Sequence, residues 1–258
     1  MGNMLEIIPI PAFQDNYIWL LKHGAHAAVV DPGDAAPVIA TLKDLSLTLD
    51  AILITHHHSD HIGGVAELLK HWPKANVYAP KREQYDFPHH AVGENDVVQL
   101  NTLNLDLTVM EVPGHTLDHV VYYGALFDTN MLFCGDTLFG AGCGRLFEGT
   151  PEQMYHSLQR LAKLPKNTAV YCTHEYTEHN LRFARSLDPG NAALAARQVD
   201  AAALRLAGKP TLPSYIGLEL ETNPFLRCHT AAIQLASGIN NTDSVAVFAA
   251  IREMRNHY

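Results

Sequence analysis

The stretch D-A-I-L-I-T-H-H-H-S-D-H-I-G-G-V, residues 50–65, combines an apolar run with a loop rich in metal-ligand side chains. The apolar run, residues 51–54, predicts a buried strand. Directly behind it stand four side chains of the kind that binds metals: His56, His58, Asp60 and His61. The first two histidines are two residues apart, so in extended chain they project to the same side. The other two ligands follow after the chain turns, and can face a second ion. The loop therefore predicts a metal centre at the end of a strand.

Length and composition set the class of protein. The chain has 258 residues, enough for one large domain or for a main domain with a smaller partner, and enough to bury a substantial core. Hydrophobic residues make up 47% and charged residues 17%, which indicates a globular protein and excludes a disordered one. The formal net charge of −9 argues against nucleic acid or an anionic membrane as a partner, because both require a basic face.

The four cysteines include no C-x-x-C pair and do not resemble a secreted disulfide scaffold, so we expect a cytoplasmic protein. Cys134 and Cys172 lie in apolar runs and are expected to be buried thiols. The N-terminal segment, which includes residues 1–3, has no basic start and no long apolar run, and no stretch reaches the length of a membrane span. We therefore expect no membrane partner, and a monomer.

Short apolar runs and helical periodicity alternate along the first two thirds of the chain, which is typical of an α/β protein. Strands are predicted at 7–10, 17–21, 27–30, 51–54, 76–79, 103–109, 120–123, 131–134 and 169–172. Helices are predicted at 35–45, 62–71, 151–161, 181–187 and 192–208, with a last one after Asp243. Residues 80–95 are polar and are expected to be irregular, and a glycine-rich loop is expected at 140–149.

Helix-capping residues support several of these helices. Asp34 and Asp243 are suitable N-caps. Thr150, Pro151 and Gln153 together form the pattern of a capping box with proline at the first helical position. Beyond residue 174 the pattern becomes mostly helical, so we predict a catalytic domain at 1–174 and a smaller helical domain at 175–258.

Four predicted strands are each followed closely by a residue that can bind a metal. These residues are His56, His115, Asp136 and His174. In α/β proteins, sites are commonly built where several strands end, so the four segments are expected to converge. With the rest of the first loop they give seven candidate ligands: His56, His58, Asp60, His61, His115, Asp136 and His174.

Seven ligands are too many for one tetrahedral ion and suit two. A carboxylate can bridge two ions and an imidazole cannot, so Asp136 is the expected bridge. We assign His56, His58 and His115 to the first ion and Asp60, His61 and His174 to the second. The absence of cysteine ligands argues against a closed structural zinc site. We expect zinc in both positions, with iron or manganese as alternatives. His57 should face away from the ions, and His119 is a candidate to support a ligand from behind.

The motif T-H-H-H-S-D-H at 55–61, with the three ligands downstream, resembles the metallo-β-lactamase superfamily. That resemblance implies a four-layer αβ/βα sandwich with a binuclear metal site along one edge. Further motifs resemble glyoxalase II, the hydroxyacylglutathione hydrolases: I-P-A-F-Q-D-N-Y at 8–17, V-D-P-G at 30–33, P-G-H-T at 113–116, C-G-D-T-L-F at 134–139, G-C-G-R-L-F-E-G-T at 142–150, T-H-E-Y-T at 173–177 and N-P-F-L-R at 223–227. The likeness covers nearly the whole chain, including its helical C-terminal part.

The resemblance implies an enzyme that hydrolyses S-D-lactoylglutathione and other 2-hydroxyacylglutathiones to D-lactate, or the matching acid, and glutathione. This reaction is the second step of methylglyoxal detoxification. Transferred residue by residue, the family's substrate contacts fall on Arg145, Phe147, His174, Tyr176 and Arg227. Some members have tyrosine in place of Phe147 and lysine shortly after Arg227, where this chain has His229. Asp118 stands where many members carry glycine.

The implied chemistry is attack on the thioester carbonyl by a hydroxide that bridges the two ions, with Asp60 and Asp136 as the catalytic carboxylates. A leaving thiolate is a weak base, with a pKa near ~8.5, so no strong general acid is required.

Four alternatives remain open. One is another hydrolase of the superfamily, such as a lactonase or a β-lactamase. Another is a mononuclear iron dioxygenase acting on glutathione persulfide, against which the complete second ligand set argues. A nuclease is disfavoured by the charge. A non-catalytic metal-binding module would be expected to lack a ligand, and none is missing.

Overall fold

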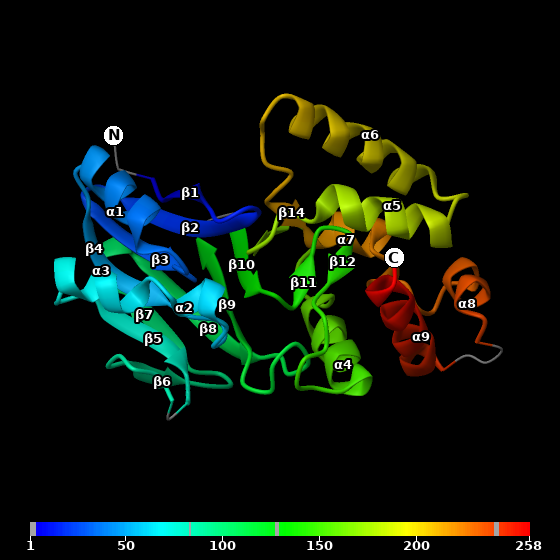
Figure 1. The fold of residues 1–258 in the computed structure, drawn as a ribbon, viewed down its shortest axis with the longest axis horizontal. Helices are drawn as coiled ribbons and strands as arrows, with labels where there is room; N and C mark the ends of the chain where they lie inside the picture. The colour runs from blue at the N-terminus through cyan, green and yellow to red at the C-terminus, as the bar shows by residue number, and fades with distance from the viewer. Residues whose placement is uncertain (1–3, 83, 127–128, 240–242) are drawn as a thin grey trace. The chain divides into compact units, whose positions relative to one another are not determined.

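The computed structural model describes residues 4–82, 84–126, 129–239 and 243–258, and so residues 1–3 lie outside the description (Figure 1). The chain forms two compact units. The first comprises Met1–Glu111 and Asp118–Gly135, and the second comprises Val112–Leu117 and Asp136–Tyr258. In sequence, therefore, the chain leaves the first unit twice, and each time within a few residues of a predicted metal ligand.

A mixed sheet in the order β1-β2-β3-β4-β5-β6 forms the larger part of the first unit. Its strands are β1 (Glu6–Ala12), β2 (Asn16–His23), β3 (His26–Val30), β4 (Thr48–Leu53), β5 (Asn76–Pro80) and β6 (His90–Val92). The first three pair antiparallel and the last four pair parallel. Parallel neighbours require crossovers, which α1 (Ala35–Asp44) and α3 (Val65–His71) provide. Their apolar sides pack on the sheet through Val38, Leu42, Val65 and Leu68.

Four further strands of the first unit run antiparallel in the order β10-β9-β8-β7. They are β7 (Val97–Leu100), β8 (Leu105–Glu111), β9 (Val120–Leu126) and β10 (Thr129–Gly135), with the short 3-10 helix η1 (Asn101–Leu103) between the first two. The buried hydroxyl of Tyr122 on β9 donates to the carbonyl of Ile54, at 2.9 Å, just beyond β4. The two groups of strands therefore face each other across a shared core.

Three predictions for the first unit were wrong in detail. Residues 80–95 contain β6, an edge strand of only three residues within an otherwise polar segment. The strand β7 was not predicted, and the strand expected from residue 103 begins at Leu105 because η1 precedes it. The helix expected over 62–71 is two helices, α2 (Ser59–Ile62) and α3. They separate at Gly63, where a Cβ atom would lie 2.7 Å from the carbonyl oxygen of Gly33.

The second unit carries the helices of the C-terminal part. Its first helix, α4 (Pro151–Leu161), has the predicted capping box. The strand β13 (Thr168–Cys172) pairs with β14 (Ser214–Tyr215). The loop predicted as glycine-rich at 140–149 begins as the turn of a small hairpin of β11 (Leu138–Phe139) and β12 (Gly142–Cys143).

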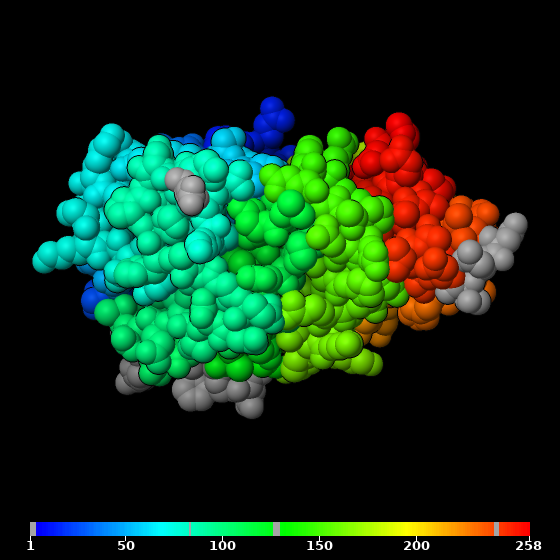
Figure 2. All heavy atoms as spheres, turned by 90° about the horizontal axis from the view of Figure 1, so that it is seen from below, coloured from blue at the N-terminus to red at the C-terminus, as the bar shows by residue number. Residues whose placement is uncertain are grey.

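Five helices and one 3-10 helix complete the described part of the second unit: α5 (Thr177–Leu187), α6 (Ala192–Leu206), α7 (Ile216–Thr222), η2 (Pro224–Leu226), α8 (Ala231–Ser237) and α9 (Ser244–Asn256). The sequence predicted α5, α6 and α9 individually, and Asp243 caps α9 as expected. Figure 2 shows α9 in red beside α8 in orange at the protein surface.

All four cysteines are buried free thiols, as predicted for Cys134 and Cys172. None of the helices in the described ranges is both long and apolar enough to cross a bilayer.

Candidate active site

The loop after β4 is held from behind by Asp31. The Asp31 carboxylate is buried, and it accepts hydrogen bonds from the backbone N–H of Thr55 at 2.8 Å and from the Thr55 hydroxyl at 2.7 Å. Its Oδ2 also lies 3.0 Å from Nδ1 of His61. One carboxylate therefore fixes both the end of the strand and the ring of a predicted ligand. In the sequence Asp31 stands out only as part of the motif V-D-P-G at 30–33.

His56 and His58 bring their ring nitrogens together. Nε2 of His56 lies 3.1 Å from Nδ1 of His58. On the other side of its ring, Nδ1 of His56 lies 3.1 Å from the Thr55 hydroxyl, whose hydrogen is already donated to Asp31. Thr55 must then accept from Nδ1–H, which leaves the lone pair on Nε2 for a metal. The buried ring of His119 stacks on His56 with centroids 4.7 Å apart, as expected for a supporting residue.

Asp60 and His61 lie on the short helix α2. Nε2 of His61 is 3.6 Å from Oδ2 of Asp60, and the same oxygen accepts a hydrogen bond of 3.1 Å from the side-chain amide of Asn16. The helix fits here because Gly33 has no side chain: a Cβ there would lie 1.9 Å from the carbonyl oxygen of Asp60. Asn16 was not singled out in the sequence, although it belongs to the motif at 8–17.

His57 makes a polar contact with Asp118, as expected for a residue that faces away from the ions. Its Nδ1 lies 3.1 Å from the carboxylate of Asp118, which also accepts from Arg82 at 2.9 Å. The residue between two predicted ligands is thus tied to an Asp–Arg pair of the same unit.

In the second unit, three predicted ligands from distant parts of the sequence meet. Oδ2 of the buried Asp136 lies 3.4 Å from Nε2 of His115 and 3.3 Å from Nε2 of His174. Nδ1 of His115 is 2.8 Å from the carbonyl oxygen of Arg145, to which it donates, so its lone pair is on Nε2. The ring of His174 stacks on Tyr176, with centroids 4.7 Å apart and planes 3° from parallel.

The donors fit divalent metal ions. In each unit considered alone, imidazole nitrogens and a carboxylate oxygen approach one another to 3.1–3.6 Å. His56 and His115 are held in the tautomer that presents Nε2, which is the form that binds a metal. Imidazole and carboxylate ligands suit zinc, iron and manganese.

A cavity of about 590 Å³ opens in the second unit beside these ligands. It is lined by His115, Asp136, Phe139, Cys143, Arg145, Phe147, Tyr176, His179, Asn180, Arg252 and Arg255. The ring of Phe139 meets His174 and Tyr176 edge-on. Phe147, which is 64% exposed, stands edge-on to His115. The cavity thus joins metal-ligand side chains to a wall of aromatic rings.

Three arginines give this cavity its charge. Arg252 is buried and donates to the carbonyl of Cys143 at 2.8 Å, while its Nε has no hydrogen-bond partner in the described part of the chain. Arg255 donates to Oδ1 of Asn180, and Arg145 lines the same cavity. Burial, together with the neighbouring charges of Arg252 and Arg145, lowers the pKa of Arg255. Among the residues that the structure describes, none of the three arginines is ion-paired with a carboxylate, so the cluster favours an anionic ligand.

Two other titratable groups of the cavity are poor candidates for chemistry. Burial, more than the opposing charge of Arg252, raises the pKa of the Cys143 thiol, so this cysteine is not an activated nucleophile. Burial and the charges of Arg255 and Arg182 lower the pKa of His179, so its ring favours the neutral form.

The predicted substrate residues separate into two groups. Arg145, Phe147 and Tyr176 line the cavity, and His174 stacks on Tyr176. Arg227 is not in this lining: it pairs with Asp188 at 2.6 Å and lines a different cavity of about 500 Å³.

The arginines on α9, Arg252 and Arg255, were missed. The available signal was an arginine directly after Ile251, on the inward side of a helix that otherwise buries apolar residues.

Comparison with known proteins gives the family. Residues 13–174 match the metallo-beta-lactamase superfamily, and residues 175–258 match the hydroxyacylglutathione hydrolase C-terminus. A hydroxyacylglutathione hydrolase from Methylobacillus flagellatus is 61% identical over 99% of this chain and 100% of the relative. The chain belongs to the hydroxyacylglutathione hydrolase family.

Solved structures agree with the metallo-β-lactamase fold. BLEG-1, a B3 metallo-beta-lactamase, superposes with a TM-score of 0.63 at 26% identity, covering 86% of this chain and 99% of that one. ETHE1 from Myxococcus xanthus gives a TM-score of 0.64 at 25% identity, covering 98% of both chains. The predicted α/β fold class, a metallo-β-lactamase sandwich with a smaller helical C-terminal part, is therefore confirmed.

Proposed function

We propose that this enzyme hydrolyses the thioester of S-D-lactoylglutathione, and of related 2-hydroxyacylglutathiones, to glutathione and the free hydroxy acid. The single observation that carries the proposal is the cavity of the second unit. Its lining includes His115 and Asp136 together with three arginines, Arg145, Arg252 and Arg255. A ligand that fills it would place one part near a metal ligand and an anionic part among the arginines. Membership of the hydroxyacylglutathione hydrolase family supports the same substrate class.

The seven predicted ligands are proposed to hold two divalent ions, of zinc, iron or manganese. The first ion would take His56, His58 and His115, the second would take Asp60, His61 and His174, and Asp136 would be shared. The proposal is supported by the converging ring nitrogens in each unit and by Asp136, whose Oδ2 is close to two imidazoles at once. When bound, such a pair of ions supplies an activated water and a Lewis acid for the thioester carbonyl.

Two side chains of the first unit, Asn16 and Asp60, are proposed to handle the proton of the attacking water. Asn16 donates to Oδ2 of Asp60 and so fixes the plane of that carboxylate, which is proposed to accept the proton of the attacking water. The departing glutathione thiolate is a weak base and does not require a strong acid. This requirement agrees with a cavity whose His179 favours the neutral form.

Glutathione carries two carboxylates, which suit the arginine cluster. Arg252 offers an Nε–H that has no partner in the described ranges, and Arg255 and Arg145 add charge beside it. The rings of Phe139, Phe147 and Tyr176 would cover the peptide. Three of these groups, Tyr176, Arg252 and Arg255, come from residues 175–258, which supports the proposal that this segment is a substrate-binding domain attached to a catalytic domain at 1–174.

We propose that the enzyme acts as a monomer. The free, buried thiols are consistent with a reducing compartment such as the cytoplasm.

The proposal is tested by metal analysis of the purified protein together with three assays. Hydrolysis of lactoylglutathione is followed by loss of thioester absorbance and is expected to be efficient. A lactone and a β-lactam are offered at matched concentrations and are expected to be poor substrates. Glutathione persulfide is offered with an oxygen electrode, and oxygen uptake is expected to be absent. Efficient turnover of the lactone or the β-lactam, or rapid oxygen uptake, with slow thioester hydrolysis, would overturn the proposal.

A further inference from the structure

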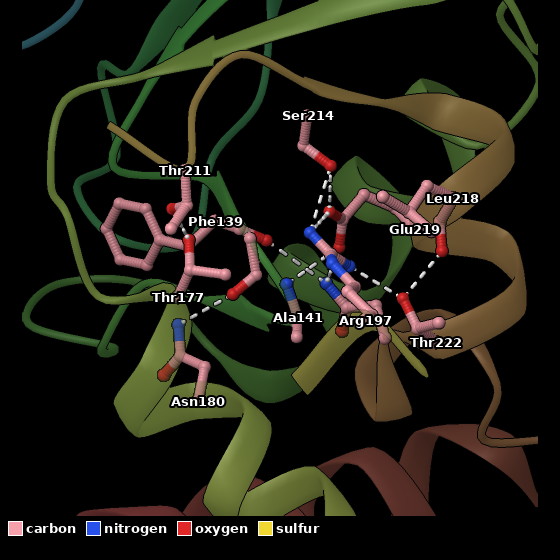
Figure 3. Close-up of polar contacts among 12 residues, drawn as sticks. Phe139, Ala141, Thr177, Asn180, Arg197, Thr211, Ser214, Leu218, Glu219 and Thr222 are labelled. Carbon is pink, nitrogen blue, oxygen red and sulfur yellow. Dashed lines mark hydrogen bonds and ion pairs between the residues drawn. The ribbon is translucent and has the colours of Figure 1, made fainter. Parts of the chain in front are cut away.

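A buried carboxyl group on α7 is the centre of a polar network that reaches the β11–β12 hairpin (Figure 3). Glu219 has no exposed surface. Its Oε1 accepts from Arg197 at 2.5 Å and from the hydroxyl of Ser214, and its Oε2 accepts from the backbone N–H of Ala141 and from the side-chain amide of Asn223, both at 2.9 Å. Four donors therefore converge on one side chain, and burial without all four would be costly.

Two of these donors connect Glu219 to the β11–β12 hairpin: the N–H of Ala141 is part of the hairpin, and the amide of Asn223 is bonded to it. Ala141 lies in its turn, is buried, and has a φ of 54°, in the left-handed region that a residue with a Cβ adopts only at a cost. The amide of Asn223 donates in addition to the carbonyls of Gly142, at 2.9 Å, and Phe139, at 3.3 Å. Glu219 thus holds the strained turn directly through Ala141 and also through Asn223.

The hairpin in turn carries cavity residues. Phe139 and Cys143 lie on its two strands and line the cavity. Phe139 stands with its ring centroid 5.8 Å from that of His174 and 5.4 Å from that of Tyr176. A second link runs through Asn180, which donates to the carbonyl of Gly140 at 3.0 Å and accepts from Arg255 at 3.1 Å. A shift of the turn would therefore reach both the aromatic wall and the arginine cluster.

We propose that Glu219 is a positioning residue: by accepting the N–H of Ala141 it fixes the turn of the hairpin, and so places Phe139 against His174 and Tyr176 in the geometry that binds substrate. Its kinetic consequence rests on the proposed function, whereas its effect on the hairpin does not.

The test compares Glu219→Gln with Thr222→Val. Glutamine keeps the shape of the glutamate side chain, but it replaces one carboxylate oxygen by an NH2 group. That group then faces two hydrogen-bond donors and cannot accept from either. Thr222 belongs to the same buried network, accepting from Arg197 at 2.6 Å and donating to the carbonyl of Leu218, but it makes no hydrogen bond to the hairpin in the described structure. Both variants lose a buried hydrogen bond, and both are expected to melt at a lower temperature.

Only Glu219→Gln is expected to change the site. Amide hydrogen exchange at Ala141 and Gly142 should accelerate by about tenfold or more, as expected for loss of a charge-assisted hydrogen bond. KM for lactoylglutathione should rise by about tenfold with kcat within about twofold, because binding geometry and not metal chemistry is altered. Thr222→Val should leave hairpin exchange and KM unchanged.

A double-mutant cycle with Ala141→Gly measures the strain. Glycine adopts positive φ without the Cβ penalty, so the turn needs less help to persist. The fall in melting temperature caused by Glu219→Gln is expected to be smaller in the Ala141→Gly background than in the parent.

Three results would overturn the proposal: equal exchange in the two buried-network variants, equal KM in both, or additive effects in the cycle. If the parent enzyme did not hydrolyse the thioester, the proposed function would fail, and the exchange and cycle data would still decide the role of Glu219.

Discussion

The histidine loop of the first unit and the arginine-lined cavity of the second treat their polar side chains in opposite ways. In the first, each carboxylate near the histidine loop already has donors: Asp31 holds Thr55 and lies beside His61, and Asp118 holds His57 and Arg82. In the second, Arg145, Arg252 and Arg255 share a cavity and, in the part of the chain that the structure describes, form no ion pair with a carboxylate. The histidine loop completes its polar pairs on folding, while the cavity of the second unit keeps a positive charge for a ligand.

This difference indicates what each unit contributes. Preformed partners orient imidazole rings at no further entropic cost, which is what a metal site requires. The unpaired arginines of the cavity, in contrast, cost free energy in the folded protein without a ligand. Burial and repulsion from the neighbouring arginines lower the pKa of Arg255. An anionic substrate would relieve that repulsion, so part of the cost of clustering the arginines is recovered on binding and not on folding.

The largest expected effect follows from removing the carboxylate shared by two imidazoles. Asp136→Ala should lose bound metal and lower kcat/KM by about a thousandfold or more. Elemental analysis and the thioester assay measure the two losses on the same sample. Asp106→Ala, on the exposed side of β8, is the matched control and should change neither. An Asp136→Ala protein with both ions and full turnover would remove Asp136 from the site.

The next effect tests the charge of the second unit. Arg255→Met keeps much of the side-chain volume and should raise KM by about tenfold with little change in kcat, because it removes one cation from the substrate cavity. The rise in KM should shrink at high salt.

Arg227→Met is the comparator, because the sequence predicted a substrate contact for Arg227 while the structure pairs it with Asp188. It should lower the melting temperature by leaving Asp188 without its cation, and change KM much less than Arg255→Met does. A larger rise in KM for Arg227→Met would restore the contact predicted from the sequence and weaken the role given to α9.

The sequence points to the proposed metal ligands more clearly than to the proposed substrate cations for a physical reason. Candidate ligands such as His56, His58 and His61 are dense in one loop, and the residue types themselves indicate the chemistry. An arginine indicates nothing by type, since most arginines are ordinary surface charges. Arg252 is recognised only when the packing of α9 shows that it is buried and has an Nε without a partner among the described residues.

The supporting residues show the same limit. Asp31 and Asn16 stand out in the sequence only within the motifs at 30–33 and 8–17, because neither carries a pattern that points to a partner 24 or 44 positions away. The strand β6 was missed because it is an edge strand three residues long with an exposed start. Pairing partners and burial are tertiary facts, and local propensity does not contain them.

A smaller effect tests the pairing in the first unit. Asp118→Asn keeps the size of the side chain but weakens its bonds to His57 and Arg82, so the loop between two proposed ligands should be held less firmly. Metal affinity, measured by competition with a chelator, should fall by about threefold, less than for a partner that touches a ligand directly. Asp106→Asn on β8 provides the control. Unchanged affinity in Asp118→Asn would show that the Asp–Arg pair is a surface feature without influence on the loop.

The smallest effect separates charge from ordinary hydrogen bonding in the second unit. Phe147→Tyr adds a hydroxyl at the exposed ring beside His115 and should lower KM by about threefold, the value of one neutral hydrogen bond, with kcat unchanged. Tyr176→Phe makes the reverse change in the same cavity while keeping the ring that stacks on His174, and should raise KM by a similar factor. Steady-state kinetics at low and high salt complete the comparison, because a neutral hydroxyl should contribute equally at both and Arg255 should not. If Phe147→Tyr changed KM by as large a factor as Arg255→Met, the arginine cluster would not dominate substrate binding. The contrast between the paired histidine loop and the charged cavity would then have no consequence for function.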